Sequence, residues 1–238
     1  MADRKPLSTQ RSAVSTSFKA TFREERKLQA AGCELIAGVD EVGRGAWAGP
    51  VVAAAVVFDS CEPAMVRKLR GVCDSKMLTH EQRVRLDRVI RRHAIAIAIA
   101  GVPHHVIDEI NILNATKAAM AMAVAHLPCK PDHLLIDAVK LADLDLPQKP
   151  IIHGDALSLS IAAASIVAKV TRDRLMIALH DRFPAYSFHT NKGYGTMAHF
   201  RAINSHGLLP LHRRSFIPMR YLVRRDTTAL ATYRKMLR

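Results

Sequence analysis

Short apolar runs separated by polar segments predict alternating strands and helices along this chain. The runs that we interpret as strands are residues 34–41, 50–58, 94–99, 133–138 and 150–152. The first two are joined by the glycine-rich turn 43–49, as in a pair of neighbouring strands. Residues 94–99 alternate Ala and Ile, which is typical of a strand buried on both faces.

Longer segments with helical patterns lie between and after these strands. Thr79 and Gln82 have the spacing of a capping box, which predicts that a helix begins there and ends near residue 93. The other predicted helices are a short one near residues 22–31 and two long ones at 107–126 and 157–182, with more helix after them. The order of elements favours a mixed sheet with helices packed on it, an α/β domain.

Composition narrows the class of protein. The chain has 238 residues, of which 49% are hydrophobic, so one large domain with a substantial core is expected. Its longest apolar runs are far too short to cross a bilayer, and the N-terminus has no apolar signal core. We therefore expect a cytoplasmic monomer that does not contact membranes. No two of the four cysteines have a C-x-x-C spacing, so we expect reduced thiols.

Positive charge is concentrated at the two ends of the chain. Of the net charge of +14, residues 1–30 contribute +4 and residues 212–238 contribute +7. Basic ends on a nearly neutral body suit a polyanionic partner such as nucleic acid, because neutralised phosphates release counterions. Basic tails that only keep the protein soluble would explain the same charges equally well.

Four carboxylates stand where predicted strands end or a helix begins. Asp40 and Glu41 close an apolar run just before glycines, Asp137 ends another run, and Asp155 precedes the long Ala-rich helix. Ligands gather beyond strand ends in α/β sheets, and an all-oxygen ligand set suits Mg²⁺ or Mn²⁺ better than zinc. The simpler interpretations are that Asp137 forms a turn and that Asp155 caps a helix.

Three glycine-flanked or polar segments could contact a nucleic acid. Gly43-Arg44-Gly45 would let a phosphate backbone approach closely, with Arg44 as a bidentate donor. Tyr194, between two glycines, could stack on a sugar or base, although a half-buried structural tyrosine is more common. The segment around Lys76 could equally be an ordinary loop. None of these signals is specific alone.

Taken in order, these segments closely resemble the ribonuclease HII (type 2 ribonuclease H) family over residues 34–218. The matching motifs are Gly38-Val39-Asp40-Glu41-Val42-Gly43-Arg44-Gly45, Asp74-Ser75-Lys76, the strand ending at Asp137, Gly154-Asp155, residues 162–173, Asn191-Lys192-Gly193-Tyr194-Gly195-Thr196 and His212-Arg213-Arg214-Ser215-Phe216. The resemblance implies a ribonuclease-H-like fold with a five-stranded mixed sheet flanked by helices. It also implies a catalytic domain at 31–218, between a flexible basic extension (1–30) and a basic C-terminal tail (219–238).

The family's activity is metal-dependent endonucleolytic cleavage, with Mn²⁺ or Mg²⁺ as cofactor. The resemblance implies that the substrates are RNA–DNA hybrids and duplex DNA containing ribonucleotides, which is nicked 5′ of the ribonucleotide to leave a 3′-hydroxyl and a 5′-phosphate. By motif, the catalytic and metal-binding residues would be Asp40, Glu41, Asp137 and Asp155. The substrate-binding residues would be Gly43, Arg44, Gly45, Lys76, Lys169 and Tyr194.

This chain departs from the family pattern in three places. Ala138 stands where many relatives have Gly, which predicts a stiffer loop after Asp137. Trp47 introduces a bulky ring near the substrate-binding glycines, and Met77 replaces a common second Lys. None of the departures affects a carboxylate.

Two other functions remain open at this point. A junction resolvase or a DNA-only exonuclease also uses clustered carboxylates on a similar fold. A basic RNA-binding protein, whose acids are only caps and turns, is the alternative that involves no catalysis.

Overall fold

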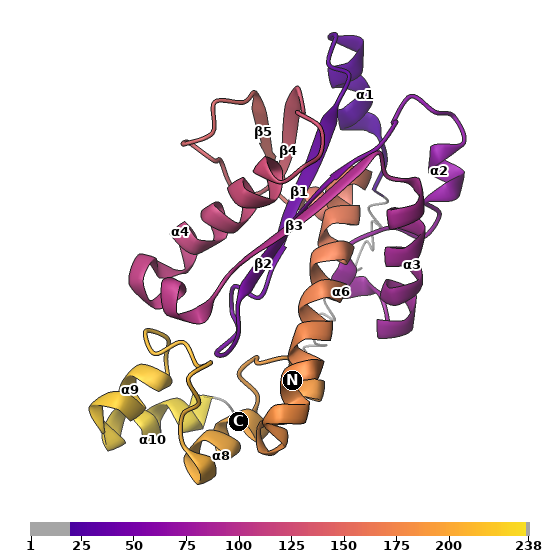
Figure 1. Cartoon of the computed structure of the whole chain (residues 1–238). Coiled ribbons are helices and arrows are strands. Elements are labelled where there is room, and N and C mark those ends of the chain that lie inside the picture. The colour runs from indigo at the N-terminus through magenta and orange to yellow at the C-terminus, as the bar shows by residue number, and fades with distance from the viewer. Residues whose placement is uncertain (1–19, 237–238) are drawn as a thin grey trace, which may run out of the picture.

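The computed structural model describes residues 20–236, which form a five-stranded mixed sheet with helices on both faces (Figure 1). The strands are β1 (Ile36–Val42), β2 (Val51–Val57), β3 (Ala96–Val102), β4 (His133–Asp137) and β5 (Gln148–Ile151). Their order in the sheet is β3-β2-β1-β4-β5. The β1–β2 and β2–β3 pairs are antiparallel, whereas β1–β4 and β4–β5 are parallel. The predicted fold class is confirmed.

Helices cover the two faces of the sheet unequally. The α-helices are α1 (Arg23–Ala30), α2 (Met65–Lys68), α3 (His80–His93), α4 (His104–Ala125), α5 (Gly154–Leu157), α6 (Leu159–Arg182), α7 (Phe188–Asn191), α8 (Met197–His206), α9 (Met219–Arg224) and α10 (Thr227–Met236). Two 3₁₀ turns, η1 (Ser75–Met77) and η2 (Pro184–Tyr186), connect some of them. Helix α4 packs on one face of the sheet, while α6, with α2 and α3 beside it, packs on the other (Figure 1).

A glycine in β1 allows α6 to lie directly on the centre of the sheet. A Cβ at Gly38 would be 2.2 Å from the backbone carbon of Ser160, a distance that no side chain tolerates. The first turns of α6 are therefore held against β1, and the rest of the helix runs past the end of the sheet where the carboxylates lie (Figure 1).

The start of α6 differs from the single helix predicted at 157–182. The short helix α5 precedes it, and Ser158 separates the two and caps α6 by accepting a hydrogen bond from Ile161 N. Glu25 of α1 accepts hydrogen bonds from the Ser158 hydroxyl (2.6 Å) and from Ser160 N (3.0 Å). Asp155 is therefore not the cap of the long helix, because Ser158 and Glu25 accept hydrogen bonds from the first N–H groups of α6.

Helix α4 is two helices joined at a kink, not the continuous one predicted. Asn111 has φ 67° and ψ 165°, and its side-chain oxygen accepts hydrogen bonds from Leu113 N and Asn114 N. Glycine is almost the only residue that usually adopts this combination of φ and ψ, and the two hydrogen bonds to the Asn111 amide oxygen stabilise it here. Asn111 thus ends the first segment and caps the second.

Both terminal extensions contribute to the packed structure where it is described. The predicted short N-terminal helix is confirmed as α1, and Phe22 just before it is buried. At the other end, Met219 is buried, and the ring of Tyr233 lies 6.1 Å from that of Trp47. Of the extension predicted to be flexible, 1–30, residues 1–19 lie outside the described residues, as do residues 237–238 of the C-terminal tail. The domain boundaries remain predictions.

Two further features of residues 20–236 concern their cysteines and the lengths of their helices. The four cysteines are free, so no disulfide links the described part of the chain. None of its helices is long and apolar enough to span a bilayer.

Candidate active site

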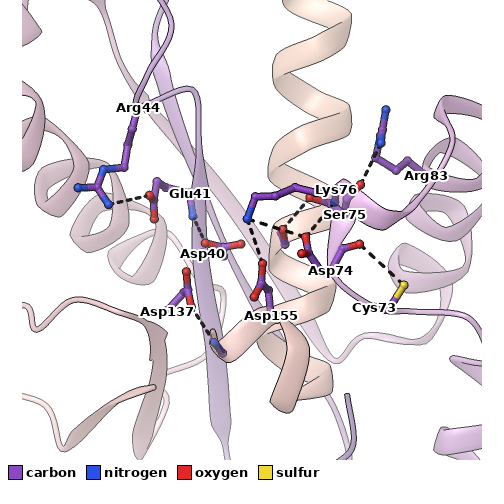
Figure 2. A network of polar contacts seen from close by, with 12 residues as sticks. Asp40, Glu41, Arg44, Cys73, Asp74, Ser75, Lys76, Arg83, Asp137 and Asp155 are labelled. Carbon is purple, nitrogen blue, oxygen red and sulfur yellow. Dashed lines mark hydrogen bonds and ion pairs between the residues drawn. The ribbon is translucent and has the colours of Figure 1, made fainter. Parts of the chain in front are cut away.

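The parallel pairing of β1 and β4 brings three of the predicted carboxylates to one edge of the sheet. The ladder between these strands ends at Val39 and Ile136. Asp40 and Glu41 follow immediately in β1, and Asp137 is the last residue of β4. The parallel strand β5 ends at the same edge and leads to Asp155 in α5. Figure 2 shows the four side chains around one opening, which we call the carboxylate edge.

Backbone hydrogen bonds orient two of these carboxylates. Asp137 Oδ1 accepts a 2.8 Å bond from Gly154 N, and Asp40 Oδ1 accepts a 2.7 Å bond from Glu41 N. A Cβ at Gly154 would be 2.6 Å from the Ile161 side chain and 3.3 Å from Asp137 Oδ1. The absence of a side chain at Gly154 thus lets the chain turn closely past Asp137, so that Asp155 comes next to it.

Burial and the charges of neighbouring acids raise the pKa values of three of these carboxylates. Burial, followed by the charges of Glu41 and Asp137, raises the pKa of Asp40 well above its ordinary value. The pKa of Glu41 is raised by burial and by Asp137, although Arg44 opposes the shift. The pKa of Asp155 is raised by burial and by Asp74 and Asp137, against the effect of Lys76. A buried group of like charges of this kind is a marker of functional sites.

One lysine reaches into the carboxylate edge. Lys76 Nζ lies 3.3 Å from Asp155 Oδ2 and 3.9 Å from Asp74 Oδ1 (Figure 2). Burial lowers the pKa of Lys76, but the charges of Asp155 and Asp74 outweigh this effect and raise it. Asp74 accepts a bond from Lys76 N as the cap of η1. It is thus a fifth acid beside the site, and its position before Ser75 and Lys76 gave no sign of this.

The chemistry of the donor set fits a hard divalent cation. All four groups offer oxygen only, and the two cations that reach them, Lys76 and Arg44, do not neutralise four carboxylates. Within the described residues, however, no three His, Cys, Asp or Glu side chains are already arranged closely enough to hold a metal ion. The donor chemistry favours a cation even so, because like-charged carboxylates repel one another when no cation lies between them. Binding an ion would then draw these side chains together.

The two glycines on either side of Arg44 are present for different reasons. Gly43 has φ 92°, and a Cβ there would be 2.3 Å from the Arg172 guanidinium. Gly45 has no other heavy atom within 4 Å of the position a Cβ would take. Packing therefore requires the first glycine but not the second, so the backbone at Gly45 is open to a ligand. Arg44 itself is partly exposed and reaches Glu41 at 3.4 Å.

Two buried arginines fix the loop that carries these glycines, residues 43–50, which we call the substrate loop after the role that the sequence predicts for it. Arg172 of α6 donates to the carbonyls of Pro50, Lys192 and Ala48 at 2.9–3.0 Å. Arg213 donates to the carbonyls of Gly49 and Arg44 at 3.0 and 2.9 Å. We call Arg172 and Arg213 the arginine brace. Sequence reasoning missed both residues because nothing in their spacing distinguishes them from surface arginines.

Tyr194 and Lys169 come together beside the substrate loop. Lys169 Nζ lies 5.7 Å from the centre of the Tyr194 ring and forms a 2.9 Å ion pair with Asp173. The Arg172 guanidinium lies 5.3 Å from the same ring. Tyr194 is half-buried, so the ring is held by cations but keeps an accessible part. The predicted substrate-binding residues thus fall into two groups, one around Lys76 and the other around Tyr194.

Comparisons with known proteins agree with this geometry. The family model described as Ribonuclease HII matches residues 37–219. A curated ribonuclease HII of Chloroflexus aurantiacus is 52% identical over 82% of this chain and 92% of its own length. The crystal structure of ribonuclease H2 from Pyrococcus horikoshii superimposes with a TM-score of 0.64 at 27% identity, covering 80% of this chain and 98% of that one. A Bst-RNase HIII in complex with Mn²⁺ shares the fold, with a TM-score of 0.59 at 23% identity over 82% of this chain and 70% of that one.

Proposed function

Because this chain belongs to the ribonuclease HII family, and so is a ribonuclease H that acts on RNA–DNA hybrids, we propose how it cleaves and what else it cleaves. It uses two divalent metal ions, and it also nicks duplex DNA on the 5′ side of a single embedded ribonucleotide. The products carry a 3′-hydroxyl and a 5′-phosphate. The observation that carries this proposal is the carboxylate edge, where four acids from three segments share one buried place.

Asp40, Glu41, Asp137 and Asp155 would hold Mg²⁺ or Mn²⁺ together with the scissile phosphate. When bound, the ions lower the pKa of the attacking water and stabilise the charge on the leaving 3′-oxygen. The raised pKa values of Asp40, Glu41 and Asp155 support this role, since each carboxylate is held where its own charge is disfavoured without a cation. The Mn²⁺ in the Bst-RNase HIII complex supports it only as an example from the same fold.

The other groups of the site would position the nucleic acid. The open backbone at Gly45 can lie against the ribose 2′-hydroxyl, the group that distinguishes RNA from DNA. Arg44 and Lys76 provide cations for the phosphates on either side of the carboxylates. Tyr194 would stack on the next sugar, supported from behind by Lys169 and Arg172. None of these residues transfers a proton or forms a covalent bond.

One gel tests this proposal. A labelled duplex with one ribonucleotide, a uniform RNA–DNA hybrid and an all-DNA duplex are each incubated with Mg²⁺, with Mn²⁺ or with excess chelator. We expect a single nick 5′ of the ribonucleotide and cleavage of the hybrid with metal, and no cleavage in chelator. Cleavage in chelator would contradict the metal mechanism. Cleavage of the all-DNA duplex would favour a DNA nuclease.

A further inference from the structure

Two buried histidines near the substrate loop have no role in the proposed chemistry. His199 lies in α8 and His212 a few residues after it, and neither is exposed to solvent. Their Nε2 atoms are 3.1 Å apart. The rings of Trp47 and Phe188 are each centred 5.5 Å from that of His199, so the histidine pair is enclosed by aromatic side chains.

The hydrogen bonds around the pair determine where its protons are. Leu209 N donates to His212 Nδ1 at 2.8 Å, so that nitrogen carries no proton. The carbonyl oxygen of Leu209 is farther from it, at 3.3 Å. The proton of neutral His212 is therefore on Nε2, from which it can only be donated to His199 Nε2. The proton of His199 is in turn on Nδ1, which donates to the carbonyl oxygen of Tyr194 at 2.9 Å.

The histidine pair is connected to both loops that would contact the substrate, the segment around Tyr194 and the substrate loop. At one end, His199 holds the backbone of Tyr194. At the other end, Arg213 follows His212 directly, and its side chain donates to the Arg44 carbonyl while its N–H donates to Trp47 O. The loops also bond to each other, because Trp47 N and Ala48 N both donate to Gly193 O.

We propose that His199 and His212 are positioning residues that set substrate preference by fixing the backbone of Tyr194 relative to the substrate loop. This inference rests on the proposed role of Tyr194. Neither histidine touches the carboxylate edge, so their effect concerns where the sugar beyond the cleavage point is held. A uniform hybrid offers many equivalent binding registers, whereas a single ribonucleotide offers only one. Misplacement of Tyr194 should therefore affect cleavage at a single ribonucleotide more than cleavage of a uniform hybrid.

The test compares His199→Leu, which removes both side-chain hydrogen bonds, with His199→Asn, whose amide can still donate to Tyr194 O. For His199→Leu we expect kcat/KM on the single-ribonucleotide duplex to fall about tenfold, as for the loss of the hydrogen bond to the Tyr194 carbonyl. We expect kcat/KM on the uniform hybrid to fall much less. His199→Asn should keep most of the preference. Equal losses on both substrates, or no loss on either, would overturn the inference.

A measurement on the unmodified protein covers the case in which His199→Leu does not fold. Nitrogen-15 NMR of the histidine rings should find the proton of His212 on Nε2 and that of His199 on Nδ1 near neutral pH. The reverse placement would mean that His199 does not donate to Tyr194, and the inference would be wrong.

Tyr194→Ala, assayed beside these variants, separates the two proposals. If it changes the substrate preference and His199→Leu does not, the role of the histidines fails and that of Tyr194 stands. If Tyr194→Ala leaves the preference unchanged, the proposed role of Tyr194 fails, and with it the inference, although metal-dependent cleavage is unaffected.

Discussion

The carboxylate edge and the loops beside it treat buried charge in opposite ways. At the edge, four carboxylates face one another, and the nearby cations pair with only some of them, Lys76 with Asp155 and Arg44 with Glu41. In the loops, the buried cations of the arginine brace face neutral carbonyls, and the histidine pair is held neutral. The comparison shows which part of the site would perform the chemistry and which part fixes the geometry. Carboxylates that repel one another mark the place that needs an added cation for chemistry. Cations that donate to backbone carbonyls mark the place that fixes geometry, although one nitrogen of Arg213, Nη2, has no hydrogen-bond partner there.

Removing one charge from the edge should give the largest effect on activity. We expect Asp40→Asn to lower kcat on the order of a thousandfold, because the several kcal/mol supplied by a correctly held metal ion would be lost. Binding of an uncleaved hybrid should change little, as measured by fluorescence anisotropy. Turnover close to that of the unmodified protein would contradict the assignment of Asp40.

The same variant should be more stable than the unmodified protein in chelator at pH 7. The folded-state pKa of Asp40 lies above its unfolded value, so its charge opposes folding at neutral pH and not at low pH. The gain in unfolding free energy should therefore disappear as the pH falls below about 4. A gain that does not depend on pH would have another cause.

Lowering the pH should destabilise the protein through the histidine pair, whereas it removes the destabilising charge of Asp40. Burial, and then the nearby His199, lowers the pKa of His212 to about 4 from 6.5. The unfolded chain binds this proton first, so stability is complete above pH 6.5 and is lost as the pH falls toward 4. The shift corresponds to roughly 3 kcal/mol. Urea unfolding of Asp40→Asn between pH 4 and 8 checks this with less interference from the edge, and a flat profile would contradict it.

The two glycines of the substrate loop form a matched pair for separating packing from binding. Gly43→Ala places a Cβ against Arg172 at positive φ, and we expect a loss of about 2 kcal/mol or more in unfolding free energy. Gly45→Ala meets open space, so its stability should change by less than about 0.5 kcal/mol.

The affinity of the stable variant completes this comparison. Gly45→Ala should raise KM for both RNA-containing substrates, because a methyl group would stand where the backbone meets the ribose. If Gly45→Ala binds and cleaves normally, the open backbone at this position is not a substrate contact.

The smallest expected effect lies just beyond Asp137. Ala138 has φ 56°, a conformation that favours glycine. Ala138→Gly should therefore raise the unfolding free energy by up to about 1 kcal/mol, after the greater freedom of glycine in the unfolded chain is counted. Ala121→Gly within α4 is the control and should be destabilised by about as much. A destabilised Ala138→Gly would mean that the local backbone is not strained.

Periodicity and local motifs were enough to predict most of the elements. The capping box at Thr79 and Gln82 is present, and both flank the start of α3 as predicted. The predictions failed where a polar side chain interrupts a helix, at Asn111 and Ser158. There the decisive hydrogen bonds depend on a local conformation or on a distant partner such as Glu25, which the apolar pattern does not contain. The predictions also failed for the strand predicted at 94–99 to be buried on both faces, because β3 (Ala96–Val102) lies at the edge of the sheet with its Ala face buried, its Ile face half-buried and Ile95 53% exposed.

For the site, the sequence by itself determined which carboxylates are available, since Asp40, Glu41, Asp137 and Asp155 each follow an apolar run or a strand. It also indicated which glycines matter, but not that Gly43 and Gly45 are present for different reasons. Only the tertiary structure decided that Arg172, Arg213, His199 and His212 hold the two loops together. The physical reason is the separation in sequence of the interacting groups. The end of a strand depends on neighbouring residues, whereas the hydrogen-bond partner of a buried polar side chain is a carbonyl or ring far away in the sequence.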